Sequence, residues 1–127
     1  MTWCIHFYAD YQSGFLWPGN DETRETYQIP INEAALPITA STRAELTRLI
    51  QWYDRSLNWE YPPDPGPFRE EECSRLNAAV RSVLARLREE LGSEWTVVDQ
   101  YVEVHEDPDL DRYLRDPKGF RREDSNG

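Results

Sequence analysis

The chain has 127 residues, and its 24 acidic and 14 basic side chains give a formal net charge of −10 at pH 7. This length is that of a single domain, and the content of 5 Trp, 7 Tyr and 4 Phe argues against a disordered chain. Two protein classes are excluded: no stretch approaches the ~18 apolar residues of a membrane-spanning helix, and so acidic a chain offers no basic patch for nucleic acid.

The N-terminal residues contain neither a basic region nor a long apolar stretch. We therefore expect no signal peptide and a cytoplasmic location. Cys4 and Cys73 are then expected to be reduced thiols in the core, because the cytoplasm disfavours disulfides. A secreted domain with one disulfide bridge is the alternative.

The first forty residues have the composition of strands and turns. Residues 2–9 alternate with period two and predict a strand. Residues 15–17 predict a short second strand that ends at the Pro-Gly-Asn turn of residues 18–20. Residues 24–31 predict a third strand, and Pro30 is typical of a strand at the edge of a sheet.

Two amphipathic helices follow. Thr42 and Glu45 fit a capping box, which predicts a helix that begins near residue 41 and ends near Asn58. A second helix is predicted over residues 69–91, since its apolar residues form one stripe and its charges suit the helix dipole. Gly92 is the residue expected to end it.

A fourth strand is predicted over residues 95–104. Its valines Val98, Val102 and Val104 share one face and are expected to point into the core. The side chains on the opposite face would then point outward together: Asp99, Tyr101, Glu103 and His105.

Residues 110–114 predict one helical turn, and residues 115–127 predict a polar tail. Together the elements predict an α+β fold with a mostly antiparallel sheet of about four strands and two helices packed on one face, in the order βββααβ. We expect residues 1–114 to form one domain.

Two groups of residues have the types, but not the spacing, of metal ligands. Zinc-ligand types occur without the close sequence pairs that structural zinc sites use, at Cys4, His6, Cys73 and His105. Asp107, Asp109 and Asp111 match the first ligands of a calcium loop, but Arg112 replaces its glycine and Lys118 its glutamate. We predict no metal site, with a weak cation site at the three aspartates as the alternative.

The sequence contains no recognisable catalytic motif. No nucleophile signature surrounds a cysteine or a histidine, and the six glycines form no phosphate-binding loop. We predict a protein without catalytic residues and without a cofactor. An enzyme built on Cys4, His6 or His105 is the alternative.

Two surface features are candidates for binding a partner. The proline-rich loop at residues 58–68 carries Trp59 and Tyr61, which are residue types that anchor interfaces or fold back over a core. The stretch at residues 94–111 has seven acids and no base, so it forms either a charged rim for a basic partner or a solvated face. The expected rim residues are Asp99, Tyr101, Glu103, Glu106, Asp107 and Asp109.

The segment from Leu49 to Gly66 resembles a helix-to-loop segment of small actinobacterial proteins of the kind proposed as immunity partners of polymorphic toxins. The residues that carry the resemblance are Trp52-Tyr53, Ser56-Leu57-Asn58 and Tyr61-Pro62-Pro63-Asp64. A helix-to-strand step at Glu89–Gly92 and Val97-Val98 is also similar. The resemblance covers residues 46–104 and implies a stoichiometric binding protein.

These observations predict an acidic cytoplasmic protein that binds and masks a basic protein partner, as an immunity protein or inhibitor does. Trp59 and Tyr61 are the expected anchors, and the acidic residues are the expected rim. The alternative is a small structural or regulatory adaptor without catalysis, either a homodimer that pairs through the edge strand at residues 24–31 or a module encoded by a phage or a gene cluster. The sequence leaves the oligomeric state open.

Overall fold

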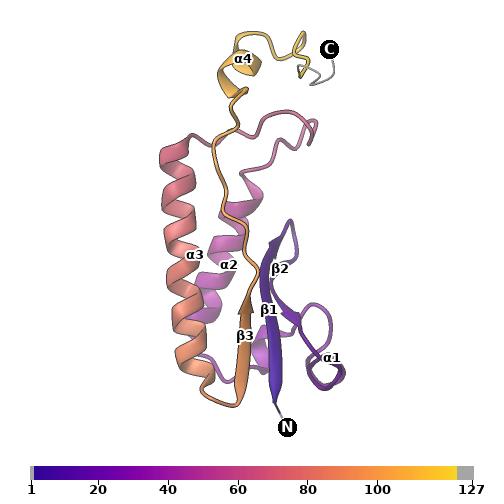
Figure 1. The fold of residues 1–127 in the computed structure, drawn as a ribbon, viewed down its shortest axis with the longest axis vertical. Helices are drawn as coiled ribbons and strands as arrows, with labels where there is room; N and C mark the ends of the chain where they lie inside the picture. The colour runs from indigo at the N-terminus through magenta and orange to yellow at the C-terminus, as the bar shows by residue number, and fades with distance from the viewer. Residues whose placement is uncertain (1, 123–127) are drawn as a thin grey trace.

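The fold is an α+β arrangement in which two long helices lie against one face of a small sheet (Figure 1). The computed structural model describes residues 2–122. Its elements in chain order are β1 (Trp3–Asp10), β2 (Gly14–Pro18), α1 (Asp21–Tyr27), the 3-10 turn η1 (Glu33–Ala35), α2 (Ala40–Asp54), α3 (Glu70–Leu91), β3 (Trp95–Asp99) and α4 (Leu110–Arg115). Among these residues, no helix is both long and apolar enough to cross a bilayer.

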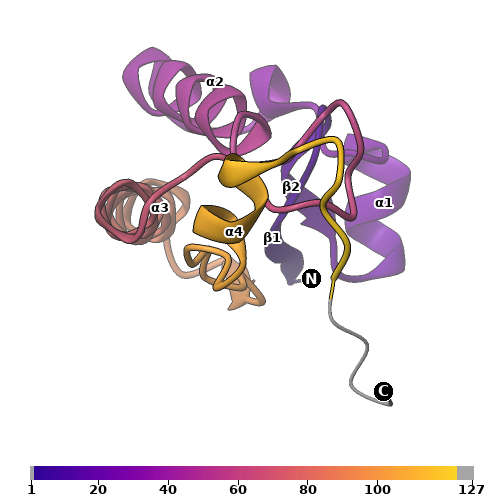
Figure 2. The same cartoon turned by 90° about the horizontal axis from the view of Figure 1, so that it is seen from above.

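The sheet has the strand order β2-β1-β3, with β1 antiparallel to β2 and parallel to β3. The α+β class is thus confirmed, but the prediction of a mostly antiparallel sheet of about four strands is wrong. Parallel neighbours need a long crossover connection, and here α2 and α3 provide it. Figure 2 shows these two helices on one side of the strands and α1 on the other.

The predicted third strand at residues 24–31 does not form, because this part of the chain is α1 and the turn after it. Asn20 caps α1, since its side-chain oxygen accepts a hydrogen bond from the Thr23 N–H at 3.0 Å. Asp21 and Glu22 suit the positive end of the helix. The alternation that suggested a strand includes Ile29, which is exposed. The chain therefore has more helices than the two predicted to pack on the sheet.

Helix α2 begins earlier and ends earlier than predicted. Its cap is Thr39, whose side chain accepts a hydrogen bond from the Thr42 N–H at 3.1 Å. The predicted capping box is wrong, because the Thr42 hydroxyl donates to Glu90 of α3 at 2.6 Å and Glu45 pairs with Arg48 at 2.7 Å. The Thr42–Glu90 hydrogen bond links α2 to α3.

Helix α3 agrees with its prediction to within one residue. It ends at Leu91, and Gly92 follows with a φ of 78°, a conformation that favours glycine. Its predicted apolar stripe is buried, at Cys73, Leu76, Val80, Val83, Leu84, Leu87 and Leu91. The stripe packs with residues of α2 and of the inner face of the sheet into one core.

The last strand is shorter than predicted and has the opposite register. Strand β3 ends at Asp99, and Tyr101 is buried at 7% exposure while Val102 is 80% exposed. Within β3, Val97 pairs with the buried Ile5 of β1 and is itself buried, while Val98 is exposed. Beyond β3, the Asn77 side chain of α3 accepts from the Tyr101 hydroxyl at 2.7 Å and bonds both the N–H and the carbonyl of Val104. The chain therefore leaves the sheet and follows α3.

The chain then reaches α4, which confirms the predicted helical turn. The following residues fold back onto α4: Phe120 is buried, and its ring meets that of Tyr113 edge to face with centroids 5.3 Å apart. Of the predicted tail at residues 115–127, residues 123–127 lie outside the described residues.

Candidate partner-binding surface

The predicted partner-binding residues fall into two places. Trp59, Tyr61, Asp107 and Asp109 lie at the end of the molecule that carries α4 (Figure 1). This end consists of the loop at residues 55–69, residues 105–109, α4 and residues 116–122, and we call it the C-terminal end. Asp99 and Glu103 lie elsewhere, beside the middle of α3.

The loop at residues 55–69, which we call the aromatic loop, is held by contacts with α2 and with the turn after β1. The Trp59 indole N–H donates to the Asp54 carbonyl at 2.6 Å, and its ring meets the edge of Tyr11 at 5.9 Å. Tyr11 in turn stacks on Tyr53 of α2 at 4.6 Å. Trp59 is nevertheless 49% exposed and Tyr61 is 59% exposed, so the loop is both anchored and open to solvent.

Asn58 shapes the loop from inside. Its side-chain oxygen accepts from the N–H groups of Glu60 and Tyr61, and its amide donates to the Pro65 carbonyl and the Tyr113 hydroxyl. Gly66 is required where the loop closes, because a Cβ there would collide with the Ser56 carbonyl oxygen. The loop therefore has one defined shape that links α2 to α4.

Exposed apolar side chains gather around two hollows at the C-terminal end. Trp59 and Leu114 line a hollow of about 240 Å³ together with Tyr113. Tyr61 lines a second hollow of about 560 Å³ with Phe120 and Arg121. Exposed aromatic residues beside a concavity are typical of interface anchors.

Asp99 and Glu103 of the predicted rim share one arginine of the chain. Arg81 of α3 binds Asp99 at 2.6 Å and lies 3.7 Å from Glu103. Tyr101, which we expected on the same outer face, is buried and bonded to Asn77. Burial raises the pKa of Tyr101 to about 12. The expected stripe of outward groups is therefore not continuous.

Glu106 supports the start of α3. Its carboxylate accepts a hydrogen bond from the Glu70 N–H at 3.0 Å, and it lies 3.7 Å from Arg69. Arg69 precedes the helix and makes no side-chain cap, so Glu106 satisfies a free N–H at the positive end of the helix. This residue has a structural role that the sequence did not indicate.

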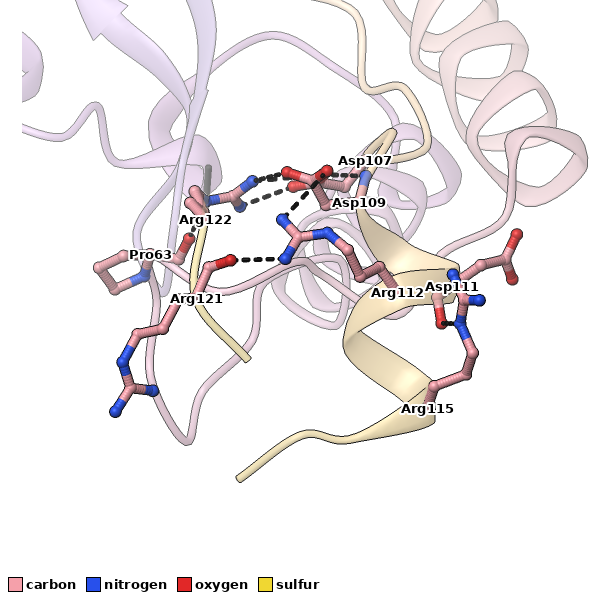
Figure 3. Close-up of polar contacts among 8 residues, drawn as sticks. All are labelled: Pro63, Asp107, Asp109, Asp111, Arg112, Arg115, Arg121 and Arg122. Carbon is pink, nitrogen blue, oxygen red and sulfur yellow. Dashed lines mark hydrogen bonds and ion pairs between the residues drawn. The ribbon is translucent and has the colours of Figure 1, made fainter. Parts of the chain in front are cut away.

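Asp107 and Asp109 are held by Arg122. Its Nη2 lies 2.7 Å from Asp107, its Nη1 lies 3.0 Å from Asp109, and its Nε donates to the Pro63 carbonyl at 2.9 Å. Figure 3 shows the guanidinium facing both carboxylates, with Arg112 also 3.5 Å from Asp109. The hydrogen bond from Arg122 holds the pKa of Asp107 below its usual value.

The predicted metal-ligand types are scattered. Both cysteines are free thiols, and Cys73 is buried in the core. His105 Nδ1 lies 2.8 Å from Glu70, and Asp111 binds Arg69 at 2.8 Å. Within residues 2–122, no three Cys, His, Asp or Glu side chains gather as a metal site would require.

The sheet presents a second candidate surface that sequence reasoning missed. On the face away from α2 and α3, Tyr8 and Trp17 stack with centroids 5.1 Å apart. His6, Tyr8 and Val102 line a hollow of about 490 Å³ near the end of this face. The alternation in β1 could have indicated this face, but the inverted register predicted for the last strand turned Val102 inward.

Comparison with known proteins gives one family match. The family is described as "Serratia CdiI immunity protein-like", and it matches residues 4–103. No curated protein matches the chain. The matched region includes β1, the aromatic loop and Glu103, but Asp107, Asp109 and Arg122 lie beyond it. Since the match covers most of its 127 residues, the chain belongs to the family of CdiI immunity protein-like proteins.

Proposed function

We propose that this protein is an immunity protein that neutralises a protein toxin by binding it. The observation that carries the proposal is the family match over residues 4–103. An immunity protein needs a stable scaffold and an exposed surface that a toxin can cover. The buried core provides the stable scaffold. The C-terminal end, with its aromatic side chains, provides the exposed surface.

The proposed contact surface is centred on the aromatic loop. Trp59 and Tyr61 supply large, half-exposed rings, and Leu114 adds an exposed apolar side chain beside them. Such rings provide contact area at a low cost in conformational entropy, because each has only two side-chain torsions. Asp107 and Asp109 border this surface as the acidic part of the rim.

The toxin surface that fits is basic. The net charge of −10 attracts a positively charged partner over distances of about a Debye length. Asp99 and Glu103 share Arg81, so their local field is weaker than their number suggests. We propose that Asp99 and Glu103 speed the association of the toxin by electrostatic attraction. Trp59 and Tyr61 would slow the dissociation of the complex. The proposal places the protein in the cytoplasm, acting by covering its partner and not by catalysis.

The alternative of an adaptor that dimerises through residues 24–31 lacks the strand on which it depended, since those residues form α1 and a turn. Sedimentation at several concentrations separates the two ideas. A monomer that forms a one-to-one complex with a toxin supports the immunity proposal. A tight homodimer that ignores the toxin supports the adaptor.

The direct test co-expresses the chain with the toxin domain encoded beside its gene, and measures growth and the Kd of the purified pair. Tyr61→Ala is expected to weaken binding about tenfold or more. Ile29→Ala is the matched control, because Ile29 is equally exposed but lies after α1. On-rates should fall as salt rises.

Two results would contradict this proposal. If the chain neither protects cells nor binds the neighbouring toxin, the immunity function is wrong. If it binds, but Tyr61→Ala and Leu114→Ala have no effect while Val102→Asp prevents binding, the interface is the open sheet face and not the C-terminal end.

A further inference from the structure

All three nitrogens of the Arg122 guanidinium face hydrogen-bond acceptors. Nη2 and Nη1 face the carboxylates of Asp107 and Asp109 at 2.7 and 3.0 Å, and Nε donates to the Pro63 carbonyl at 2.9 Å. These acceptors come from two segments, the aromatic loop and the turn before α4 (Figure 3). Three different nitrogens are therefore recognised at once.

This geometry selects a guanidinium over an ammonium. A guanidinium is planar and presents N–H groups in several fixed directions, which matches acceptors that converge from three sides. In a lysine ammonium all the N–H donors are on one nitrogen, so it could not reach all three acceptors together. The acceptor set is therefore specific for arginine chemistry.

The two carboxylates are less exposed than the guanidinium that pairs with them. The Asp107 side chain is 21% exposed, whereas that of Arg122 is 42% exposed. Asp107 is also fixed from within its own turn, because its Oδ1 accepts from the Asp109 N–H at 2.8 Å. Partly exposed ion pairs contribute little to stability, so this contact is one that can exchange.

The site also borders the surface proposed for the toxin. Arg122 and Pro63 line the same hollow as the exposed Tyr61 ring. Asp107, Asp109 and Arg122 all follow residue 103, where the family match ends. The two carboxylate acceptors and their occupant therefore lie outside the matched region, whereas the Pro63 carbonyl lies inside it.

We propose that Asp107, Asp109 and the Pro63 carbonyl form an arginine-binding site, which Arg122 fills in the free protein and an arginine of the toxin fills in the complex. This inference rests on the proposed function. The exchange replaces one guanidinium by another, so no buried charge is left unpaired. Arg122 acts as a competitor that a toxin displaces only when it also covers Tyr61 and the neighbouring apolar residues.

The site can be tested without the toxin. Full-length wild type and Arg122→Ala are titrated with N-acetyl-arginine methylamide, followed by the carboxyl ¹³C signals of Asp107 and Asp109. The variant is expected to bind about tenfold more tightly than the wild type, because Arg122 no longer competes for the two carboxylates; Arg112, 3.5 Å from Asp109, is present in both proteins. N-acetyl-lysine methylamide should bind neither protein measurably at the same concentrations.

Matched variants control for general effects of charge. Arg121→Ala removes the neighbouring arginine, which donates to the Phe120 carbonyl and not to the two aspartates, and should behave as wild type. Asp107→Asn in the Arg122→Ala background should abolish binding. Circular dichroism establishes that each variant is folded, and Arg122→Gln serves if Arg122→Ala is not. Equal binding of the arginine probe to wild type and Arg122→Ala, binding to neither, or equal binding of the lysine probe would overturn the site.

The toxin complex tests the exchange itself. Asp107→Asn should weaken toxin binding about tenfold, and Arg122→Ala should strengthen it. If the toxin binds and neither variant changes its Kd, the exchange is wrong while the immunity function stands. If the toxin does not bind at all, the immunity function fails, and the probe titration still decides whether the arginine site exists.

Discussion

The body of the molecule and its C-terminal end are held together by different forces. In the body, α2 and α3 bury apolar side chains against the sheet, and Ile5, Leu49 and Leu76 have no exposed surface. At the C-terminal end few apolar side chains are buried, among them Leu110 and Phe120, while hydrogen bonds and ion pairs link its segments and Trp59 and Tyr61 remain half exposed. Burial of this kind is worth far more than partly exposed ion pairs.

This contrast separates stability from recognition. A surface held by exchangeable polar contacts can adjust to a partner, whereas a close-packed core cannot change without loss of stability. The family match covers the body and the aromatic loop but stops before Asp107. Asp107 and Asp109, the acidic part of the proposed interface, thus lie outside the region that the family match covers.

The largest expected effect is in the core. Leu76→Ala should reduce the free energy of unfolding by about 2–5 kcal/mol, because it leaves a cavity among fully buried side chains. Leu114→Ala, at the C-terminal end, should change it by less than about 0.5 kcal/mol. Urea denaturation measures both. Similar losses for the two leucines would mean that both regions carry the stability of the fold.

The next effect concerns the link between the two regions. Asn77→Ala removes every side-chain hydrogen bond that holds Tyr101 and Val104 to α3, and should destabilise the protein by about 2–3 kcal/mol. Tyr101→Phe removes one of these bonds and should cost about 1 kcal/mol. If both variants lose the same amount in urea denaturation, the Val104 bonds contribute nothing and the link is the tyrosine alone.

A smaller effect on global stability is expected at Phe120. Phe120→Ala should release residues 116–122, so that trypsin cleaves after Lys118 or Arg121 faster than in the wild type. The free energy of global unfolding should fall by less than about 1 kcal/mol, because this segment opens separately from the body. A loss of several kcal/mol would show instead that the two regions unfold as one unit.

The smallest effect is a pH dependence at the start of α3. The hydrogen bond to Glu70 raises the pKa of His105 above its usual value. The stabilisation is therefore fully present below the unfolded pKa of about 6.5, and it is lost as pH rises through the folded pKa. NMR titration should show a lower His105 pKa in Glu70→Gln. Glu71→Gln is the control, since Glu71 lies near Arg75 and not near His105. If Glu70→Gln leaves the His105 pKa unchanged, the Glu70–His105 contact does not stabilise the protein.

Much of the fold could be predicted because local sequence patterns suffice for it. The apolar stripe of α3 and its end at Gly92 were predicted nearly residue by residue, since helical periodicity and a C-terminal glycine are local signals. The strand predicted over residues 24–31 failed because the cap at Asn20 outweighed the alternation of Tyr27, Ile29 and Ile31.

The candidate surface was predicted less well. Trp59 and Tyr61 are exposed, as their use as anchors requires, and their role in binding stays a prediction. The predicted inward positions of Val98 and Val102 were wrong, since both are exposed, whereas Val104 packs against the core. Tyr101 turns inward because Asn77, a buried residue on another element, binds its hydroxyl. Nothing near Tyr101 in the sequence indicates this partner.

The sequence by itself determined the class of the fold, the two long helices and the surplus of negative charge, because these depend on composition and on neighbours along the chain. Only the tertiary structure decided which carboxylates remain available. Arg81 reaches Asp99, and Arg122 reaches Asp107, across separations that no local pattern encodes. Ion pairs depend on distances in space, so the charge of a residue can be read from the sequence while its partner cannot.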